Sequence, residues 1–201
     1  FFRIPMDKLP FRAIIFSMYF LALPVIKKRQ IIEGVGEVTF GLEDNTFDFK
    51  PGQFVRVILP ELRAHDPRGT SRDFTIASLP NGRDLSIVFR MGDVLSGFKQ
   101  TLLSLPHGER VTISGPHGNM ILPASPARPL VFVAGGIGIT AFEQKIRHAL
   151  TDNKNYRITL LWTASHGTQL PYRSELHNLS RTHKYAFTLV EKFGTRVDKR
   201  L

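Results

Sequence analysis

The sequence has 201 residues, of which 42% are hydrophobic, 10% aromatic and 22% charged, and it contains no cysteine. This composition is typical of a globular protein, and the chain is long enough for one large domain or two small ones. The absence of cysteine excludes a disulfide framework, a cysteine-ligated metal centre and thiol chemistry within this sequence.

The net charge of +10 is concentrated at the two ends of the sequence. Residues 1–30 carry six Lys or Arg and one acidic residue, residues 31–128 carry ten and eleven, and residues 129–201 carry eleven and five. A basic C-terminal third can bind the phosphates of a small nucleotide as well as those of a nucleic acid. Both kinds of partner stay open at this point.

Residues 13–26 form an apolar run without a charged side chain. A helix needs about 20 apolar residues to cross a bilayer, so this run, which also contains Pro24, is too short to cross alone. One interpretation is the end of a membrane segment or signal sequence, with Lys27, Lys28 and Arg29 on the cytoplasmic side. We favour an apolar lead-in, residues 1–26, which packs on the domain and enters the first strand at Val25 and Ile26.

Residues 27–126 have the pattern of short strands separated by turns. Turn signals stand at residues 51–52, 81–82 and 106–108, where glycine permits a positive φ. A helix is expected to begin after Ser96 and to run through Leu103. The alternating apolar positions are Val38, Phe40 and Leu42, then Val55, Val57 and Leu59, then Leu85, Ile87 and Phe89, then Val111 and Ile113. This pattern predicts an antiparallel barrel or sandwich.

Residues 127–201 have a different character. Prolines at 123, 126 and 129 place a boundary near residue 127. The apolar run at 130–134 predicts a strand buried on both faces, followed by glycines and a helix with Phe142, Ile146, Ala149 and Leu150 on one face. A strand at 157–163, a short helix at 172–179 and a strand at 185–190 complete a βαβαβ unit. A doubly wound domain has five or six strands, so we expect this one to be incomplete.

The segment at residues 71–78, Ser-Arg-Asp-Phe-Thr-Ile-Ala-Ser, carries a cation, an aromatic face and a hydroxyl close together. Arg72 could bind a phosphate bidentately, Phe74 could pack on a flat ring, and Thr75 could bond to a heteroatom. Taken alone, the segment is more typical of an ordinary edge strand with a surface arginine. Its neighbours in the sequence decide between these interpretations.

Three further motifs follow it. Ser96 stands as the N-cap of the predicted helix, whose free amides could hold a diphosphate. A Gly-Pro-His-Gly turn occupies residues 115–118, and residues 136–141 satisfy a relaxed Gly-x-Gly-x-x-Ala dinucleotide fingerprint directly after a strand. No acidic residue closes the second strand about 20 residues further on, which disfavours an ordinary ribose-binding dehydrogenase.

In this order and setting, the motifs make the sequence resemble the ferredoxin-NADP reductase superfamily over about residues 27–201. Residues 72–75 are similar to the family's Arg-x-Tyr-Ser flavin motif, with Pro-Gly-Gln-Phe at 51–54 upstream. Residues 115–118 are similar to its Gly-Pro-x-Gly turn, and residues 135–140 to its Gly-Gly-x-Gly-x-Thr nucleotide loop.

The resemblance implies a β plus α/β two-domain fold. An antiparallel Greek-key flavin-binding β-barrel would occupy residues 27–126, and an incomplete doubly wound α/β nucleotide-binding domain would occupy residues 127–201. The implied cofactors are FAD and NAD(P)H, with Arg72 on the flavin diphosphate, Phe74 on the isoalloxazine or ribityl region, and Thr75 near flavin N5 as the catalytic residue. The other implied cofactor-binding residues are Ile76, Val88, Arg90, Ser96, Gly97, Phe98, Gly135, Gly136, Gly138, Ile139 and Thr140.

The sequence departs from the family pattern at three places. Phe74 replaces the commoner Tyr, which keeps an aromatic face but loses a hydroxyl that could affect flavin affinity or potential. Ala141 replaces the usual Pro, which loosens the helix start without removing its amides. The family's C-terminal Cys-Gly-Pro segment and terminal aromatic have no counterpart before Leu201, so we expect a C-terminally truncated chain that holds flavin yet turns over poorly.

These observations predict a cytoplasmic, FAD-dependent oxidoreductase that takes hydride from NAD(P)H and passes electrons to an unidentified acceptor, such as a ferredoxin- or flavodoxin-type protein or a small molecule. The cofactor supplies the chemistry, so neither a catalytic triad nor a metal site is expected. The choice between NADH and NADPH is open, because Arg173, Lys192 and Arg196 could either bind a 2′-phosphate or be solvated surface charges.

Two other functions are weighed against this prediction. One is the flavin domain, on the cytosolic face of a membrane, of a protein similar to ferric reductases or NADPH oxidases, with residues 1–26 as the end of a last helix; that group has His where this sequence has Arg72. The other is a basic nucleic-acid-binding module built on the barrel, which the slight acidic excess of residues 31–128 disfavours.

Overall fold

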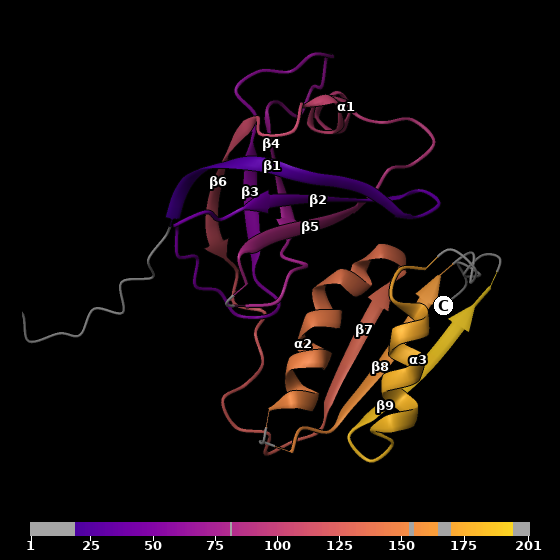
Figure 1. The fold of residues 1–201 in the computed structure, drawn as a ribbon. Helices are drawn as coiled ribbons and strands as arrows, with labels where there is room; N and C mark the ends of the chain where they lie inside the picture. Colours follow the sequence, from indigo (N-terminus) through magenta and orange to yellow (C-terminus); the bar gives the residue numbers. More distant parts are fainter. Residues whose placement is uncertain (1–18, 81, 153–154, 165–169, 195–201) are drawn as a thin grey trace, which may run out of the picture.

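The computed structural model describes residues 19–80, 82–152, 155–164 and 170–194. The first part contains six strands and one helix (Figure 1). Their bounds are β1 (Tyr19–Ile32), β2 (Val35–Gly41), β3 (Phe54–Ile58), β4 (Ser71–Thr75), β5 (Asp84–Arg90), α1 (Gly97–Ser104) and β6 (Arg110–His117). All neighbouring strands are antiparallel, in the order β4-β3-β6-β1-β2-β5.

The structure confirms the predicted antiparallel part. Its six strands form one sheet, which does not close into the continuous barrel that was expected. The two edge strands, β4 and β5, approach each other where a single bridge joins Ile76 to Ile87. Next to it, the amide of Ala77 donates to the carbonyl of Ser86 at 2.8 Å. The predicted alternation holds in β3, where Val55 and Val57 are fully buried.

Strand β1 begins earlier than the sequence suggested. Residues Tyr19 to Pro24 pair with β6, and Leu23 and Val25 are buried in the core. This part of the apolar run is a strand and not the end of a membrane helix, because its alternate side chains fill the core of the sheet. Among the described residues, no helix is both long and apolar enough to span a bilayer. Residues 1–18 of the predicted lead-in lie outside the described residues.

The second part is a three-stranded parallel sheet in the order β7-β8-β9. Its elements are β7 (Leu130–Gly135), a 3₁₀ turn η2 (Gly136–Ile139), α2 (Thr140–Thr151), β8 (Ile158–Ala164), α3 (Arg173–Thr182) and β9 (Phe187–Phe193). Both helices cover the same face of this sheet (Figure 1). Ile146 of α2, Leu176 of α3 and Trp162 of β8 are fully buried between the helices and the sheet. The predicted βαβαβ unit is confirmed.

The prediction that the strand at 130–134 is buried on both faces is wrong. Val131 and Val133 are 62% and 65% exposed, and Leu161 and Val190 on the neighbouring strands are exposed as well. In a strand, alternate side chains point to opposite faces, and α2 and α3 cover only one of them. An apolar run cannot show whether anything covers its second face. We call these four residues the apolar stripe.

Candidate functional site

Strand β4 carries the three residues of the predicted flavin motif at the edge of the antiparallel sheet. In its ladder with β3, Arg72 lies opposite Val57, and Thr75 lies opposite Phe54. The ring of Phe74 is half-buried, with its centroid 5.6 Å from that of Phe89 in β5. The flat face expected at Phe74 is thus fixed by packing.

The backbone next to Thr75 has a defined direction. The amide of Ile76 donates to the carbonyl of Gln53 at 3.1 Å. Because hydrogen bonding alternates along an antiparallel pair, the amide of Thr75 points away from β3 and toward the side of β5. The side chain of Ile76 is buried, so only its backbone could contact a cofactor. The side chain of Thr75 is half-buried.

The guanidinium of Arg72 is held inside the protein, and its side chain is only 13% exposed. Its Nη1 donates to the carbonyls of Arg68 and Gly69 at 2.9 and 3.0 Å, and its Nη2 lies 2.6 Å from Oδ1 of Asp66. Its Cζ lies 5.2 Å from the ring centroid of Phe98. Nε is buried and has no hydrogen-bond partner among the described residues. A buried donor of this kind fits an anionic oxygen.

Asp66 is a site residue that the sequence analysis missed. Its side chain is 2% exposed and accepts hydrogen bonds from the amides of Arg68 and Phe98 at 3.0 and 3.1 Å. Burial opposes ionisation of Asp66, but these two amides, the hydroxyl of Ser96 and the charge of Arg72 outweigh it and lower the pKa to about 2. One carboxylate therefore links Arg72 to the start of α1.

The start of α1 has the predicted N-cap. The hydroxyl of Ser96 accepts from the amide of Lys99 at 3.4 Å. A Cβ at Gly97 would overlap the carbonyl oxygen of Ala64, so the loop before β4 packs directly on the helix. The ring of Phe98 is buried in the core, and its amide already donates to Asp66. A diphosphate at this place would therefore share the Phe98 amide with Asp66 or displace it.

Basic side chains surround this single carboxylate. Arg90 is exposed at the end of β5, and Nζ of Lys99 donates to its carbonyl at 2.6 Å. Burial and the positive charges of Arg68, Arg72 and Arg90 lower the pKa of Lys99. Four cations around one carboxylate suit an anion with more than one negative charge. Arg68 and Lys99 were not predicted, and Val88, which was, is buried beside Arg90.

The predicted nucleotide loop lies at the C-terminal end of β7. Gly136 has φ +49°, and no heavy atom lies within 4 Å of a Cβ built at Gly135, Gly136 or Gly138. Gly135 and Gly138 are exposed, so the backbone here is open to a ligand. Ile139 is buried and anchors the loop. The hydroxyl of Thr140 donates to the carbonyl of Ile137 at 3.0 Å.

Trp162 of β8 holds this loop from below. Its Nε1 donates to the carbonyl of Gly136 at 3.1 Å, and its ring is fully buried. Sequence reasoning missed this role because the residue lies 26 positions further along the chain. Only the pairing of β7 with β8 brings the two together.

The three candidates for a 2′-phosphate have different environments. Arg173 at the start of α3 makes a two-point ion pair with Glu191 of β9, both contacts at 3.0 Å. Lys192 is exposed. Arg196 lies outside the described residues. Sequence reasoning alone could not predict the pairing of Arg173.

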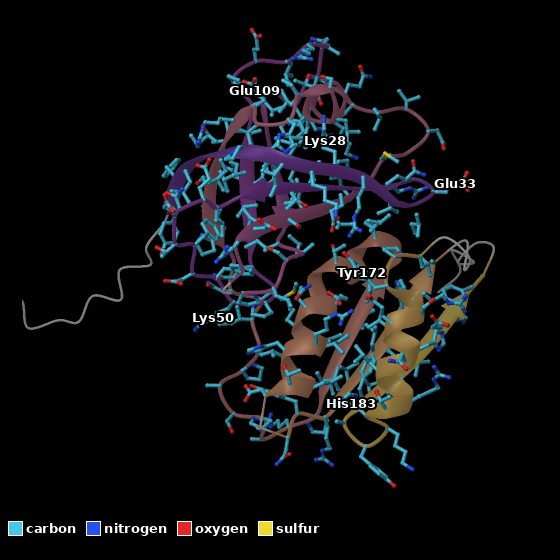
Figure 2. All side chains as sticks on the ribbon, viewed as in Figure 1. Lys28, Glu33, Lys50, Glu109, Tyr172 and His183 are labelled. Carbon is cyan, nitrogen blue, oxygen red and sulfur yellow. The ribbon has the colours of Figure 1, made fainter. Side chains whose placement is uncertain are left out.

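A cavity of about 360 Å³ lies between the β1–β2 hairpin and the start of α3. Arg29, Glu37 and Tyr172 contribute to its wall. Figure 2 shows Tyr172 at the end of the α/β part that faces the antiparallel sheet. Burial, followed by the charges of Glu143, Glu37 and Glu175, raises the pKa of Tyr172. The phenol therefore stays neutral.

Comparisons with known proteins agree with this geometry. The sequence model described as "Oxidoreductase NAD-binding domain" matches residues 132–200. The chain is 28% identical over 166 residues to the reductase component of phenol 2-monooxygenase from Pseudomonas sp. (strain CF600), covering 78% of this chain and 44% of that protein. It is 32% identical over 163 residues to ferredoxin–NADP reductase B from Sorangium cellulosum (strain So ce56), covering 78% and 63%.

Among solved structures, the cytochrome b5 reductase domain of Ulva prolifera nitrate reductase matches with a TM-score of 0.73 and 19% identity, covering 90% of this chain and 76% of that one. The fold class is thus an antiparallel sheet domain joined to a parallel α/β domain. The proteins that the chain matches are FAD- and NAD(P)-binding oxidoreductases of the ferredoxin-NADP reductase superfamily, so the predicted resemblance to this superfamily is confirmed. It spans about half the length of the curated relatives that it matches.

Proposed function

We propose that this protein is a flavin-dependent reductase that takes hydride from NAD(P)H and passes electrons to a separate acceptor. The observation that carries the proposal is the convergence of Arg72, the start of α1 and β4 on one site. The names of two relatives support the acceptor class, since one is a monooxygenase reductase component and the other a ferredoxin reductase. We infer a redox protein or an oxygenase component as the acceptor here.

The residues of the antiparallel part fit FAD. The buried Nε of Arg72 offers a donor to the diphosphate, and the surrounding cations offset its charge. Phe74 presents an aromatic face, and Thr75 directs its amide away from β3, toward the place where the ring would lie. Bound FAD would supply the redox chemistry, accepting hydride and releasing electrons.

The residues of the α/β part fit a pyridine nucleotide. The open glycines at 135, 136 and 138 let a diphosphate approach the backbone closely. Thr140 and the first turn of α2 would then orient the nicotinamide toward the flavin. We propose residues 27–126 as the flavin-binding domain and residues 127–201 as part of the nucleotide-binding domain.

The first prediction tests Arg72. Replacing it, Arg72→Ala, should weaken FAD binding by about 1.5 to 3 kcal/mol, the range for a hydrogen bond to a charged group. The measurement is the dissociation constant from a titration of the flavin-free protein with FAD, followed by flavin fluorescence. Arg56→Ala is the matched control, because Arg56 of β3 forms an exposed ion pair with Asp73, the neighbour of Arg72 in β4. An unchanged dissociation constant in Arg72→Ala, or an equal loss in the control, would contradict the assignment.

A further inference from the structure

Two consecutive polar residues of α2 are buried where this helix meets the antiparallel part of the molecule. Gln144 is 6% exposed and Lys145 is 2% exposed. Nε2 of Gln144 donates to the carbonyl of Ala77 at 2.7 Å, and Nζ of Lys145 donates to the carbonyl of Met120 at 2.8 Å. Figure 1 shows the first turns of α2 directly against the sheet. Burying a polar side chain costs free energy unless it forms a specific hydrogen bond.

The side chain of Lys145 is closely surrounded by the turn at Gly52, the carbonyl of Met120 and two aromatic rings. Gly52, in the turn before β3, has φ +99°, and a Cβ there would overlap the carbonyl oxygen of Met120 and lie 2.7 Å from Cε of Lys145. The ammonium lies 4.7 and 5.4 Å from the ring centroids of Phe142 and Phe132, which stack on each other. This amine therefore has one position, set by a carbonyl and two rings.

The contact at Gln144 joins the two segments to which the proposed function assigns cofactors. Ala77 lies two residues after Thr75 on the flavin side, and Gln144 lies four residues after Thr140 on the nucleotide side. The amide of Ala77 is itself held by the carbonyl of Ser86, so the accepting carbonyl is rigidly placed. A single hydrogen bond thus connects the strand of Thr75 to the helix that follows the glycine loop.

We propose that Gln144 and Lys145 are positioning residues that fix the nucleotide-binding part against the flavin-binding sheet, and so set the approach of nicotinamide to flavin. The consequence for hydride transfer rests on the proposed function, whereas the fixed orientation of the two parts does not. Hydride transfer is steeply sensitive to the placement of the reacting atoms, so a small rotation of the helix would slow it without removing either binding site.

The variants are chosen to fold. Gln144→Met loses the hydrogen bond to Ala77, but it also removes Oε1 of Gln144, a buried acceptor with no partner within the described part of the chain. Removing this unsatisfied acceptor offsets part of the loss in stability. In Lys145→Met, a buried charge is replaced by an apolar chain of similar length. Lys28→Met is the matched control, since Nζ of Lys28 donates to the carbonyl of Leu103 at 2.7 Å within the antiparallel part alone.

The first measurement needs neither flavin nor nucleotide. Because the sequence contains no cysteine, Glu109→Cys and Tyr185→Cys place one spin label in each part, both at exposed positions. Figure 2 shows Glu109 and His183, which lies two residues before Tyr185, at opposite ends of the molecule. Electron spin resonance then gives the distribution of distances between the labels. We expect the double variant Gln144→Met with Lys145→Met to broaden or shift this distribution, and Lys28→Met to leave it unchanged. An unchanged distribution in the double variant overturns the proposal.

The second measurement is stopped-flow reduction of the FAD-loaded protein by NADH and by NADPH. We expect the limiting reduction rate of the double variant to fall roughly tenfold, the factor that corresponds to the free energy of about one hydrogen bond. The FAD dissociation constant and the nucleotide concentration for half-maximal rate should change less than about twofold. A parallel loss of FAD or nucleotide affinity would make these residues part of a binding site and overturn the positioning role. If the unmodified protein is not reduced at all, the proposed function fails, and the label distances still decide the positioning role.

Discussion

At the scale of single residues, the arrangement around Arg72 depends on one carboxylate. Asp66 pairs with the guanidinium and accepts the amide of Phe98, so the two groups expected to bind a diphosphate already share an internal anion. This arrangement keeps the positive charge of Arg72 buried and in place. The surplus of positive charge from Arg68, Arg90 and Lys99 is what leaves the site attractive to a further anion.

The pH dependence of stability tests the role of Asp66. Its pKa in the folded protein, about 2, lies below the ordinary value of 3.8, so ionised Asp66 stabilises the fold above about pH 4, and this stabilisation is lost as the pH falls toward 2. Asp66→Asn should therefore be less stable than the parent at pH 7, and the difference should shrink toward pH 2. Urea unfolding at several pH values measures this, with the exposed Asp93→Asn as control. A difference that does not depend on pH would refute the prediction.

For Lys145 stability also rises with pH, but at alkaline pH and because the charged form destabilises the fold. Burial lowers its pKa from 10.5 to about 8, so between pH 8 and 10.5 the unfolded chain binds a proton that the folded protein lacks, and stability rises with pH. At neutral pH the buried charge costs up to about 3 kcal/mol. Lys145→Met should remove this cost, so the variant should be more stable than the parent. This difference in stability should be largest at pH 7 and decline toward pH 10.5. Denaturant unfolding measures it, and a constant difference would count against the buried charge.

At the scale of elements, the antiparallel strands and α1 could be predicted because their patterns are local. Alternation in β3 and the cap at Ser96 depend on neighbours in the sequence, and both are present in the structure. The partner of Arg72 could not be predicted, because Asp66 belongs to a loop with no periodic pattern. The end of α3 at Thr182 and the start of β9 at Phe187 differ from expectation by two or three residues, since element ends depend on tertiary packing.

The glycine loop after β7 provides a prediction at this scale. Trp162→Phe removes the hydrogen bond to the carbonyl of Gly136 and leaves a small cavity, so we expect a loss of stability of about 1 to 3 kcal/mol and weaker binding of NAD(P)H. FAD affinity should be unaffected. Tyr156→Phe is the matched control, because the hydroxyl of Tyr156 donates to the carbonyl of Pro123, away from the loop. Titrations with each cofactor decide, and an equal loss for both would rule out a local role.

At the scale of the whole molecule, the order of the motifs predicted more than any motif did. The flavin motif, the Gly-Pro-His-Gly turn and the glycine loop each occur in unrelated contexts, but their order along the chain fits one two-part fold. What the order could not predict is how the parts meet. The contact of α2 with Ala77 and Met120 joins residues 67 and 25 positions apart, and it depends on side chains without a sequence signature.

The apolar stripe affects how the purified protein should behave in solution. At low ionic strength, the net charge of +10 keeps molecules apart, and the stripe stays in contact with water. Added salt shortens the range of this repulsion to about 10 Å at 0.1 M, and the four uncovered side chains then favour self-association. Solubility should therefore fall as sodium chloride is added, the reverse of the salting-in that many proteins show.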